Sequence, residues 1–359
     1  LGLDESAPAL FEAYGAEQTR FVKSAYLQAL KELDVTPYLD ALRERYQQLL
    51  AYEPSEDEKK HVAQERSLLQ QLLSENDVLK KHTFRGWRRT NDVIFTTEYA
   101  LREPLQKQIE MRSREAVRTA LHPFGVRVRT TELSQLSRMH AYRELLFTLR
   151  IRGTVRGNAA ELSRALLDGG LITLLEELHA ETAPFYFRIE VRGMEDTVQK
   201  TALAKELARE LEQGSGGRLF NSTTDYEVEL RLIRTKDGSF YPCLKLYTIA
   251  DDRFAWRKQT ISASMHPSLA AALIELARPY LSEQSVVLDA LCGVGTFVIE
   301  RNLRMKAYDN YAVDLYGQAI AGARQNAAAA GVTCNFITKD FTQFTSKHRM
   351  TEIFADMPK

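Results

Sequence analysis

Residues 286–296, VVLDALCGVGT, decide the fold of the second half of the chain. An apolar run typical of a buried strand comes first, and an acid and two closely spaced glycines follow before a helix-like segment. Glycine lets a ligand approach the backbone, and open α/β sheets bind ligands at the carboxyl ends of their strands. The segment therefore predicts a strand, a turn and a helix around a ligand. The alternative is an ordinary tight turn without a ligand.

Strand-like and helix-like segments alternate on both sides of this turn. Strands are expected at 285–289, 308–313, 333–338 and 352–355, and helices at 268–280, 296–304 and 316–330. Such alternation predicts a doubly wound parallel sheet of the Rossmann-like type.

Acidic residues follow three of these strands and indicate the ligand. Val298 stands where a dinucleotide-binding motif has its third glycine, which favours a smaller, nucleoside-like ligand. Asp314, after the second strand, can accept both ribose hydroxyls, and Asp340 can accept an adenine amino group with Phe341 beside the ring. The alternatives are a helix N-cap for Asp314 and an exposed loop acid for Asp340.

The third acid, Asp356 in IFADMP at 353–358, ends the fourth strand where a target base would enter. This constellation resembles the class I S-adenosyl-L-methionine (SAM) dependent methyltransferases, and Asp356-Met357-Pro358 resembles their amino-methylating Asp/Asn-Pro-Pro-Tyr/Phe motif. The resemblance implies SAM as cofactor and Asp356, Met357 and Pro358 as catalytic residues. The cofactor-binding residues that it implies are Asp289, Leu291, Cys292, Gly293, Gly295, Thr296, Asp314, Leu315, Asp340 and Phe341.

The sequence departs from the family pattern in two respects. Met357 replaces the first proline and Lys359 stands at the aromatic position, so a catalytically silent RNA-binding protein that retains the SAM fold is an alternative. An adenine-N6 methyltransferase, which uses a similar motif, is another. A class I sheet normally has seven strands, so the four expected here indicate an incomplete catalytic domain.

The sequence from about residue 82 onward resembles a more specific family, and this resemblance does not cover the N-terminal 80 residues. The segments FYFRIEVRG at 185–193, NSTTDYEVELRLI at 221–233 and RFAWRKQTISASMHPSLAAAL at 253–273 resemble THUMP-containing RNA methyltransferases. The resemblance implies methylation of an exocyclic base amine, N2 of guanosine in transfer RNA or 23S ribosomal RNA. RNA is therefore the expected partner.

These patterns predict a multidomain α/β and α+β chain. The expected parts are a helical region at 1–81, a ferredoxin-like part at 82–155, a THUMP-like RNA-binding domain at 156–250, a linker at 251–266 and the methyltransferase domain at 267–359. Within 82–155 we expect a long helix near 103–121.

Charge is unevenly distributed although the chain has no net charge. Residues 81–160 contain 16 Lys and Arg against 7 Asp and Glu, whereas residues 1–80 carry a net charge of −6. Arginine favours bidentate phosphate contacts, so a polyanion partner is expected. The candidate RNA-binding residues are Arg127, Arg129, Arg188 and Arg192. A solvated basic face is the alternative reading.

Composition excludes several other classes of protein. No apolar run approaches the roughly 18 residues of a membrane span, and the N-terminus lacks the pattern of a signal peptide. The three cysteines have no metal-ligand spacing and suit a reducing compartment. We expect a cytoplasmic protein without a membrane partner or a bound metal.

Overall fold

The computed structural model describes residues 6–52, 54–76, 82–115, 117–181, 184–262 and 264–357. Two predicted residues, Pro358 and Lys359, lie outside the described residues. The chain divides into two compact units, and both are discontinuous. The first unit contains Leu1–Gly86 and Phe147–Ile249, and the second contains Trp87–Leu146 and Ala250–Lys359. Every helix in the described residues is too short or too polar to cross a membrane.

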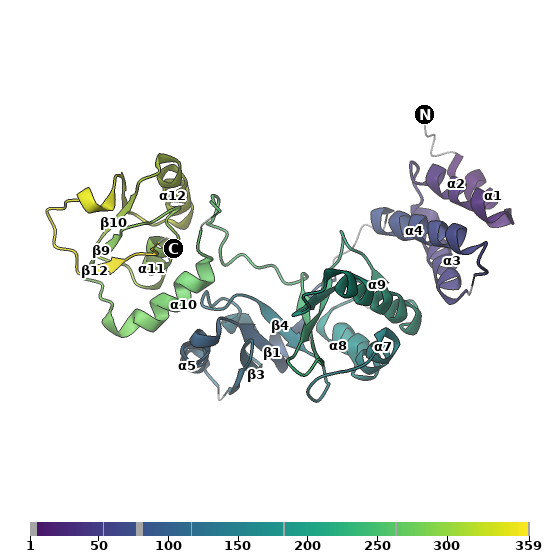
Figure 1. Ribbon diagram of the computed structural model, residues 1–359, viewed down its shortest axis with the longest axis horizontal. Coiled ribbons are helices and arrows are strands. Elements are labelled where there is room, and N and C mark those ends of the chain that lie inside the picture. Colours follow the sequence, from purple (N-terminus) through teal and green to yellow (C-terminus); the bar gives the residue numbers. More distant parts are fainter. Residues whose placement is uncertain are drawn as a thin grey trace. The chain divides into compact units, whose positions relative to one another are not determined.

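The first unit begins with the helical region expected from the sequence. Its helices are α1 (Ala7–Ala16), α2 (Arg20–Leu30), α3 (Leu39–Ala51) and α4 (Lys59–Asn76), drawn in purple in Figure 1. Their apolar faces share one buried core, to which Leu27, Leu42 and Leu69 belong. Tyr186 and Phe220, from later in the chain, complete this core.

The remainder of the first unit is a sheet with helices. Its strands lie in the order β4 (Leu145–Thr148), β8 (Phe240–Leu246), β7 (Val228–Arg234), β5 (Phe185–Arg192) and β6 (Leu219–Asn221). Its helices are α7 (Ala159–Asp168), α8 (Leu171–Leu178) and α9 (Thr197–Gly214). Asn158 and Asp196 cap α7 and α9 by accepting backbone N–H bonds, and this fixes where the two helices begin.

The second unit begins with an antiparallel layer. Strand β1 (Asn91–Thr96) pairs with β3 (Gly125–Thr130), which pairs with β2 (Arg118–His122). Helix α5 (Arg102–Arg112) packs on β2 and β3, and the short helix α6 (Leu133–Leu136) follows. The prediction of a long helix near 103–121 is therefore wrong. Ser113 closes α5 by donating to the Ile109 carbonyl at 2.9 Å, and β2 then pairs with β3.

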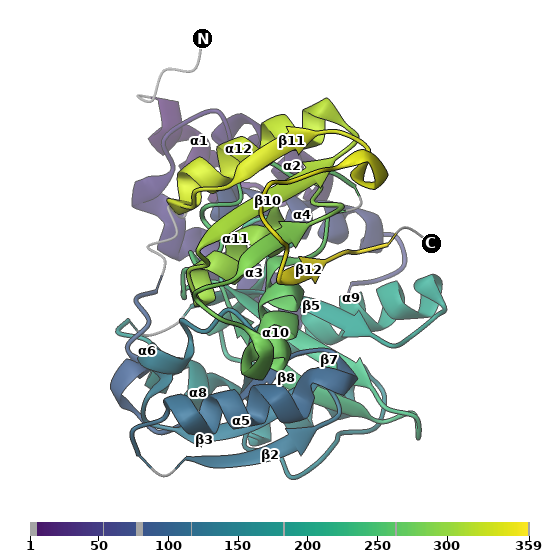
Figure 2. The same cartoon turned by 90° about the vertical axis from the view of Figure 1, so that its left-hand side faces the viewer.

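The second unit ends with a parallel sheet in the order β11 (Asn335–Thr338), β10 (Asp309–Asp314), β9 (Val286–Asp289) and β12 (Glu352–Phe354) (Figures 1 and 2). Its helices are α10 (Pro267–Ala277), α11 (Thr296–Arg304) and α12 (Gly317–Ala330). The Rossmann-like part of the predicted fold is confirmed. Val298 and Ala323 of the two last helices pack on one face, and Phe344 and Met350 pack on the other.

Polar contacts join the two segments of the second unit. The fully buried Glu300 of α11 lies 3.0 Å from Nδ1 of His140, and Arg253 donates to the carbonyls of Met139 and Tyr142 at 3.0 and 2.9 Å. Residues 139–142 are thus held by residues of the later segment, 250–359.

Candidate functional site

The glycine turn after β9 has the geometry predicted for a ligand cradle. Gly293 and Gly295 adopt positive φ angles of 52° and 79°. A Cβ on Gly295 would lie 3.2 Å from the Ala323 Cβ, so both the conformation and the space require glycine. The Cys292 N–H donates to Val313 at 3.0 Å and joins the turn to β10.

Asp314 at the end of β10 is held in place before any ligand binds. The Gly293 N–H donates to its Oδ2 at 2.9 Å, and the Tyr316 N–H donates to its Oδ1 at 2.9 Å. Each carboxylate oxygen can accept a further hydrogen bond. Asp314 therefore orders the turn and keeps acceptor capacity for two hydroxyl groups.

Asp289 is buried beneath the turn without a full set of partners. Its Oδ2 and the Thr296 hydroxyl are buried polar atoms that have no hydrogen-bond partner among the described residues. Burial raises the pKa of Asp289 to about 7, and the charges of Asp314 and Asp356 act in the same direction. The three acids thus converge on one side of the turn.

Asp356 is positioned by the strand that precedes it. Strand β12 pairs with β9, and the Ala290 N–H donates to the Phe354 carbonyl at 3.0 Å. Within the buried core, Arg301 of α11 donates to both oxygens of Glu352 at 2.8 and 2.9 Å. This bidentate ion pair fixes β12, so the exposed Asp356 lies beside the turn.

The other predicted cofactor residues lie around this edge of the sheet. Leu291 is half-buried and Cys292 is buried within the turn. Asp340 follows β11 and accepts bonds from the Thr342 N–H and hydroxyl at 2.9 and 2.7 Å, which lower its pKa.

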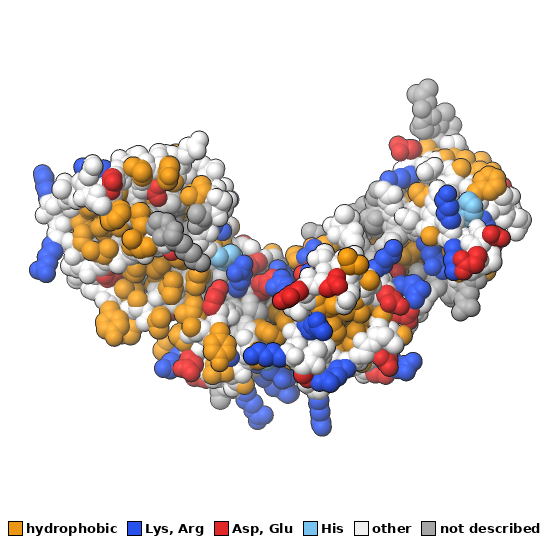
Figure 3. Space-filling model, in the orientation of Figure 1, with side chains coloured by type: hydrophobic (Ala, Val, Ile, Leu, Met, Phe, Trp, Pro, Cys, Tyr) orange, Lys and Arg blue, Asp and Glu red, His pale blue; other side chains and the backbone are white. Residues whose placement is uncertain are grey.

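Apolar side chains are exposed near these acids. Leu315, Phe341 and Met357 are 62%, 41% and 63% exposed. Hydrophobic side chains gather on the surface of this C-terminal part in Figure 3. Exposed apolar patches rimmed by polar groups commonly mark binding surfaces, and a nucleoside has a large apolar ring to cover.

Two positioning contacts of the site were not predicted from the sequence. Asn326 of α12 is fully buried and donates to the Val294 and Gln259 carbonyls at 3.0 Å, which ties the glycine turn to the linker. The second contact is the Arg301–Glu352 pair. For the first contact, the sequence offered a signal, an asparagine within an alanine-rich helix. For the second contact, no local sequence pattern indicates that residues 301 and 352 pair.

Two of the predicted RNA-binding arginines lie on β3 of the second unit. Arg127 and Arg129 are exposed and alternate with the buried Val126 and Val128. Arg127 donates to Asp92 at 2.8 and 2.6 Å. Arg118 of β2 lies opposite Arg129 in the strand register, so the outer face of this layer is rich in arginine.

The other two arginines lie on β5 of the first unit. Arg188 donates to Glu229 at 3.0 and 2.5 Å, and its guanidinium lies 4.2 Å from the Tyr226 ring centroid. Arg192 is exposed and lies 3.9 Å from Glu190. Arg188 thus has a structural partner, which a phosphate would have to share.

The residues of the turn fit a nucleoside cofactor with a cationic centre. Asp289 offers an unpaired oxygen, Asp314 offers acceptors, and the glycine turn leaves space at the backbone. Residues 255–358 match the family model described as UPF0020, RMKL-like methyltransferase domain. The C-terminal part of the chain is a methyltransferase domain. Its cofactor is S-adenosyl-L-methionine.

Solved structures with a similar fold include other methylases. TrmN from Thermus thermophilus is 20% identical, with a TM-score of 0.53 over 74% of this chain and 79% of that one. A possible methylase from Clostridium difficile 630 is 15% identical, with a TM-score of 0.53 over 75% of this chain and 81% of that one. A predicted N6-adenine-specific DNA methylase from Listeria monocytogenes is 14% identical, with a TM-score of 0.52 over 75% and 80%. These similarities confirm the α/β multidomain fold.

Proposed function

We propose that this methyltransferase acts on RNA and transfers the methyl group to an exocyclic base amine, N2 of guanosine in transfer RNA or 23S ribosomal RNA. The observation that carries the proposal is the position of Asp356. Strand β12 ends beside the glycine turn, so an exposed carboxylate lies next to the cofactor edge. An acid there can accept the protons of an amine and direct its lone pair.

Orientation is the main contribution expected from Asp356. The lone pair of a guanine amine is delocalised into the ring, so the amine must be held in line with the methyl group. A strong base is not required, because the amine becomes acidic once the methyl has transferred. SAM supplies the electrophilic methyl group when bound. Met357 completes the proposed base site together with Pro358, which lies outside the described residues.

The parts before the methyltransferase domain are proposed to hold the RNA. We assign this role to the ferredoxin-like part at 82–155 and the THUMP-like domain at 156–250. The exposed arginine face of β2 and β3 supports it, because phosphate contacts position RNA without reading its sequence. The target base would be flipped out of its stack to reach Asp356.

Methyl transfer to RNA tests this proposal directly. The full chain is incubated with tritiated SAM and unmodified total RNA, and the labelled RNA is digested to nucleosides. Labelled N2-methylguanosine is the expected product. Transfer only to DNA, or to no nucleic acid although SAM binds, would contradict the proposal.

Adenine N6 is the second candidate target. The Asp-Met-Pro sequence also resembles the motif of adenine methylases, and the protein from Listeria monocytogenes named above is described as N6-adenine-specific. Labelled N6-methyladenosine in the same digest would favour this candidate.

A further inference from the structure

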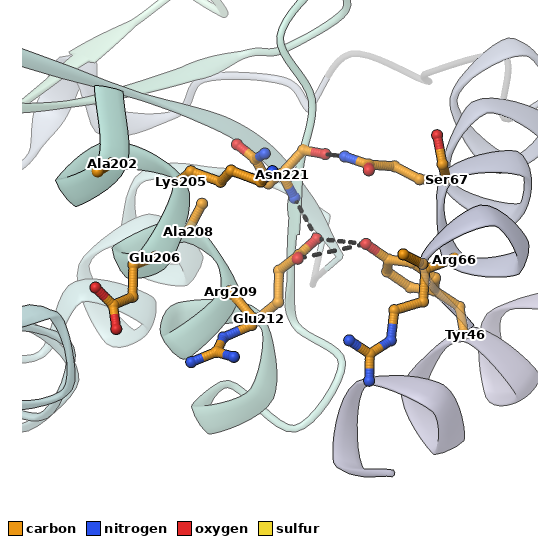
Figure 4. Close-up of a pocket in the computed structure, with 12 residues that line it drawn as sticks. Tyr46, Arg66, Ser67, Ala202, Lys205, Glu206, Ala208, Arg209, Glu212 and Asn221 are labelled. Carbon is orange, nitrogen blue, oxygen red and sulfur yellow. Dashed lines mark hydrogen bonds between the residues drawn. The ribbon is translucent and has the colours of Figure 1, made fainter. Parts of the chain in front are cut away.

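A groove runs between α4 and α9 of the first unit (Figure 4). It consists of two adjoining cavities of about 580 and 720 Å³, which share Ala63, Arg66 and Arg209 in their walls. Because one wall belongs to the N-terminal helices and the other to α9, both segments are needed to form it. Neither the methyltransferase site nor its cofactor uses this groove.

The floor of the groove is a satisfied buried network. Glu212 accepts a hydrogen bond from the Asn221 N–H at 2.7 Å and one from the Tyr46 hydroxyl at 3.2 Å. Burial raises the pKa of Glu212 to about 7, so near neutral pH this carboxyl carries only part of a negative charge. The floor therefore neutralises the cations above it only in part.

Four cationic side chains line the groove, and two of them, Arg66 and Lys205, lack a carboxylate partner among the described residues. Lys59, at the edge of the second cavity, pairs with Glu56. Arg66 donates to the Leu49 and Tyr52 carbonyls, and its buried Nε has no acceptor among the described residues. Lys205 makes no hydrogen bond or ion pair within the described part of the chain, and in Figure 4 it extends toward Asn221. Arg209 lies one helical turn after Lys205, and its carboxylate partner among the described residues is its neighbour Glu210, at 2.8 Å.

The cations also oppose one another. Burial lowers the pKa of Arg66, and the charge of Arg209 acts in the same direction, whereas Tyr46 and Glu212 act in the opposite one. Glu206 lines the same cavity, but its carboxylate points away from Arg66 in Figure 4. A bound anion would relieve this repulsion and supply the missing acceptors.

We propose that the groove between α4 and α9 binds successive phosphate groups of an RNA strand. This inference rests on the proposed function, because the methyltransferase must hold an RNA. A single phosphate could occupy one cavity, whereas two adjoining cavities suit successive phosphates of a chain. The N-terminal helices would then form a second RNA contact, apart from the arginines predicted from the sequence.

Charge reversal at exposed positions tests the groove. The variant Lys205→Glu with Arg209→Glu changes two exposed groove residues, and Lys306→Glu with Arg349→Glu is the matched control at exposed positions of the methyltransferase domain, outside the groove and outside the parts assigned to hold the RNA. Binding of a fluorescein-labelled, unmodified transfer RNA transcript is measured by anisotropy from about 0.05 to 0.3 M salt. We expect the groove variant to bind about 10-fold more weakly. The slope of log Kd against log salt concentration should be smaller by about 1.4 than in the wild type, which corresponds to two lost phosphate contacts on a single strand.

Further arms separate the outcomes. Arg66→Gln should weaken binding in the same direction, and thermal melting shows whether each variant is folded. Equal weakening in the groove and control variants, or no weakening in either, would overturn the proposal. Competition by poly-glutamate but not by RNA would assign the groove to an acidic peptide, and competition by inorganic phosphate alone would assign it to a single anion.

Failure of the inference is distinguishable from failure of the proposed function. If the wild-type protein binds and methylates RNA while the groove variant does so equally well, only the groove assignment is wrong. If the wild-type protein neither binds nor methylates RNA, the proposed function itself is wrong.

Discussion

Two buried carboxyl groups, Glu212 in the first unit and Asp289 in the second, have similar pKa values but different partners. Burial raises the pKa of each to about 7. Glu212 accepts hydrogen bonds from Asn221 and Tyr46, whereas Oδ2 of Asp289 has no partner among the described residues.

The difference shows what distinguishes a ligand site from a structural contact. Leaving a buried acceptor unsatisfied costs about 1 to 3 kcal/mol, so Asp289 gains most when a donor arrives. Glu212 already has its donors and joins the helical region to α9 and β6. The raised pKa values alone would make Glu212 and Asp289 equal candidates for ligand binding. The missing hydrogen-bond partner of Asp289 distinguishes the two.

The largest expected effect is on Asp356, the exposed acid beside Asp289. Asp356→Ala should lower the single-turnover rate of methyl transfer by about 100-fold or more, because orientation of the amine is lost. SAM affinity should stay within a few-fold, as measured by calorimetry. Glu283→Ala, at an exposed acid before β9, is the control. A near-normal rate for Asp356→Ala would show that Asp356 does not orient the amine, whereas no methyl transfer by the wild-type protein would point to a catalytically silent protein.

The next largest effect is on cofactor affinity. Asp314→Ala removes a charged acceptor for the ribose hydroxyls, which is worth about 1.5 to 3 kcal/mol, or roughly 10- to 150-fold in Kd. Because Asp314 also holds the Gly293 and Tyr316 amides, Asp314→Asn serves as the milder comparison. Calorimetry with SAM gives both values, and an unchanged Kd for the alanine variant would remove Asp314 from the site.

The pH dependence of SAM binding tests Asp289. A cationic cofactor favours the ionised form of Asp289. Below the pKa of about 7, Asp289 of the free protein is protonated and must lose its proton when the cofactor binds, which weakens binding. Affinity should therefore rise about 10-fold between pH 6 and 8. Asp289→Asn should abolish this rise, and Glu212→Gln should retain it. A parallel rise in all three proteins would show that another group titrates.

The smallest expected effect concerns stability and Glu212. Its pKa is raised from 4.5 to about 7 in the folded state, so the folded protein holds the proton more tightly. This contribution to stability is present at low pH and is lost as the pH rises from about 4.5 through 7. The free energy of unfolding of the wild type should therefore fall by about 1 kcal/mol more than that of Glu212→Gln between pH 6 and 8. Urea unfolding at both pH values measures this difference, and a difference of zero would mean that Glu212 stays ionised.

The parallel sheet was predictable because its signals are local. Residues 286–296 specify a strand, a turn and a helix within one short segment, and the acids follow strands that must end at the same edge of the sheet. Strand β2 was not predictable in this way. Residues 113–121 have helical composition, but pairing of Arg118–His122 with β3 overrides it, and that pairing is a tertiary interaction.

The contacts that position the site could not be predicted, because they join distant residues. His140 and Glu300 are separated by 160 positions, and Arg301 and Glu352 by 51. Each residue alone resembles a surface charge in the sequence. Only the packing of α11 places Glu300 and Arg301 in the interior, where they require partners.

The second unit is assembled from two separate segments of the chain, and this sets an order of events during synthesis. Residues 87–146 leave the ribosome before residues 147–249, which belong to the other unit, and the partner of His140 comes later still. At 5 to 20 residues per second, the first segment waits roughly 5 to 20 s for the linker to appear. During that interval, the β1–β3 layer has to persist without the contacts that residues 250–359 will supply.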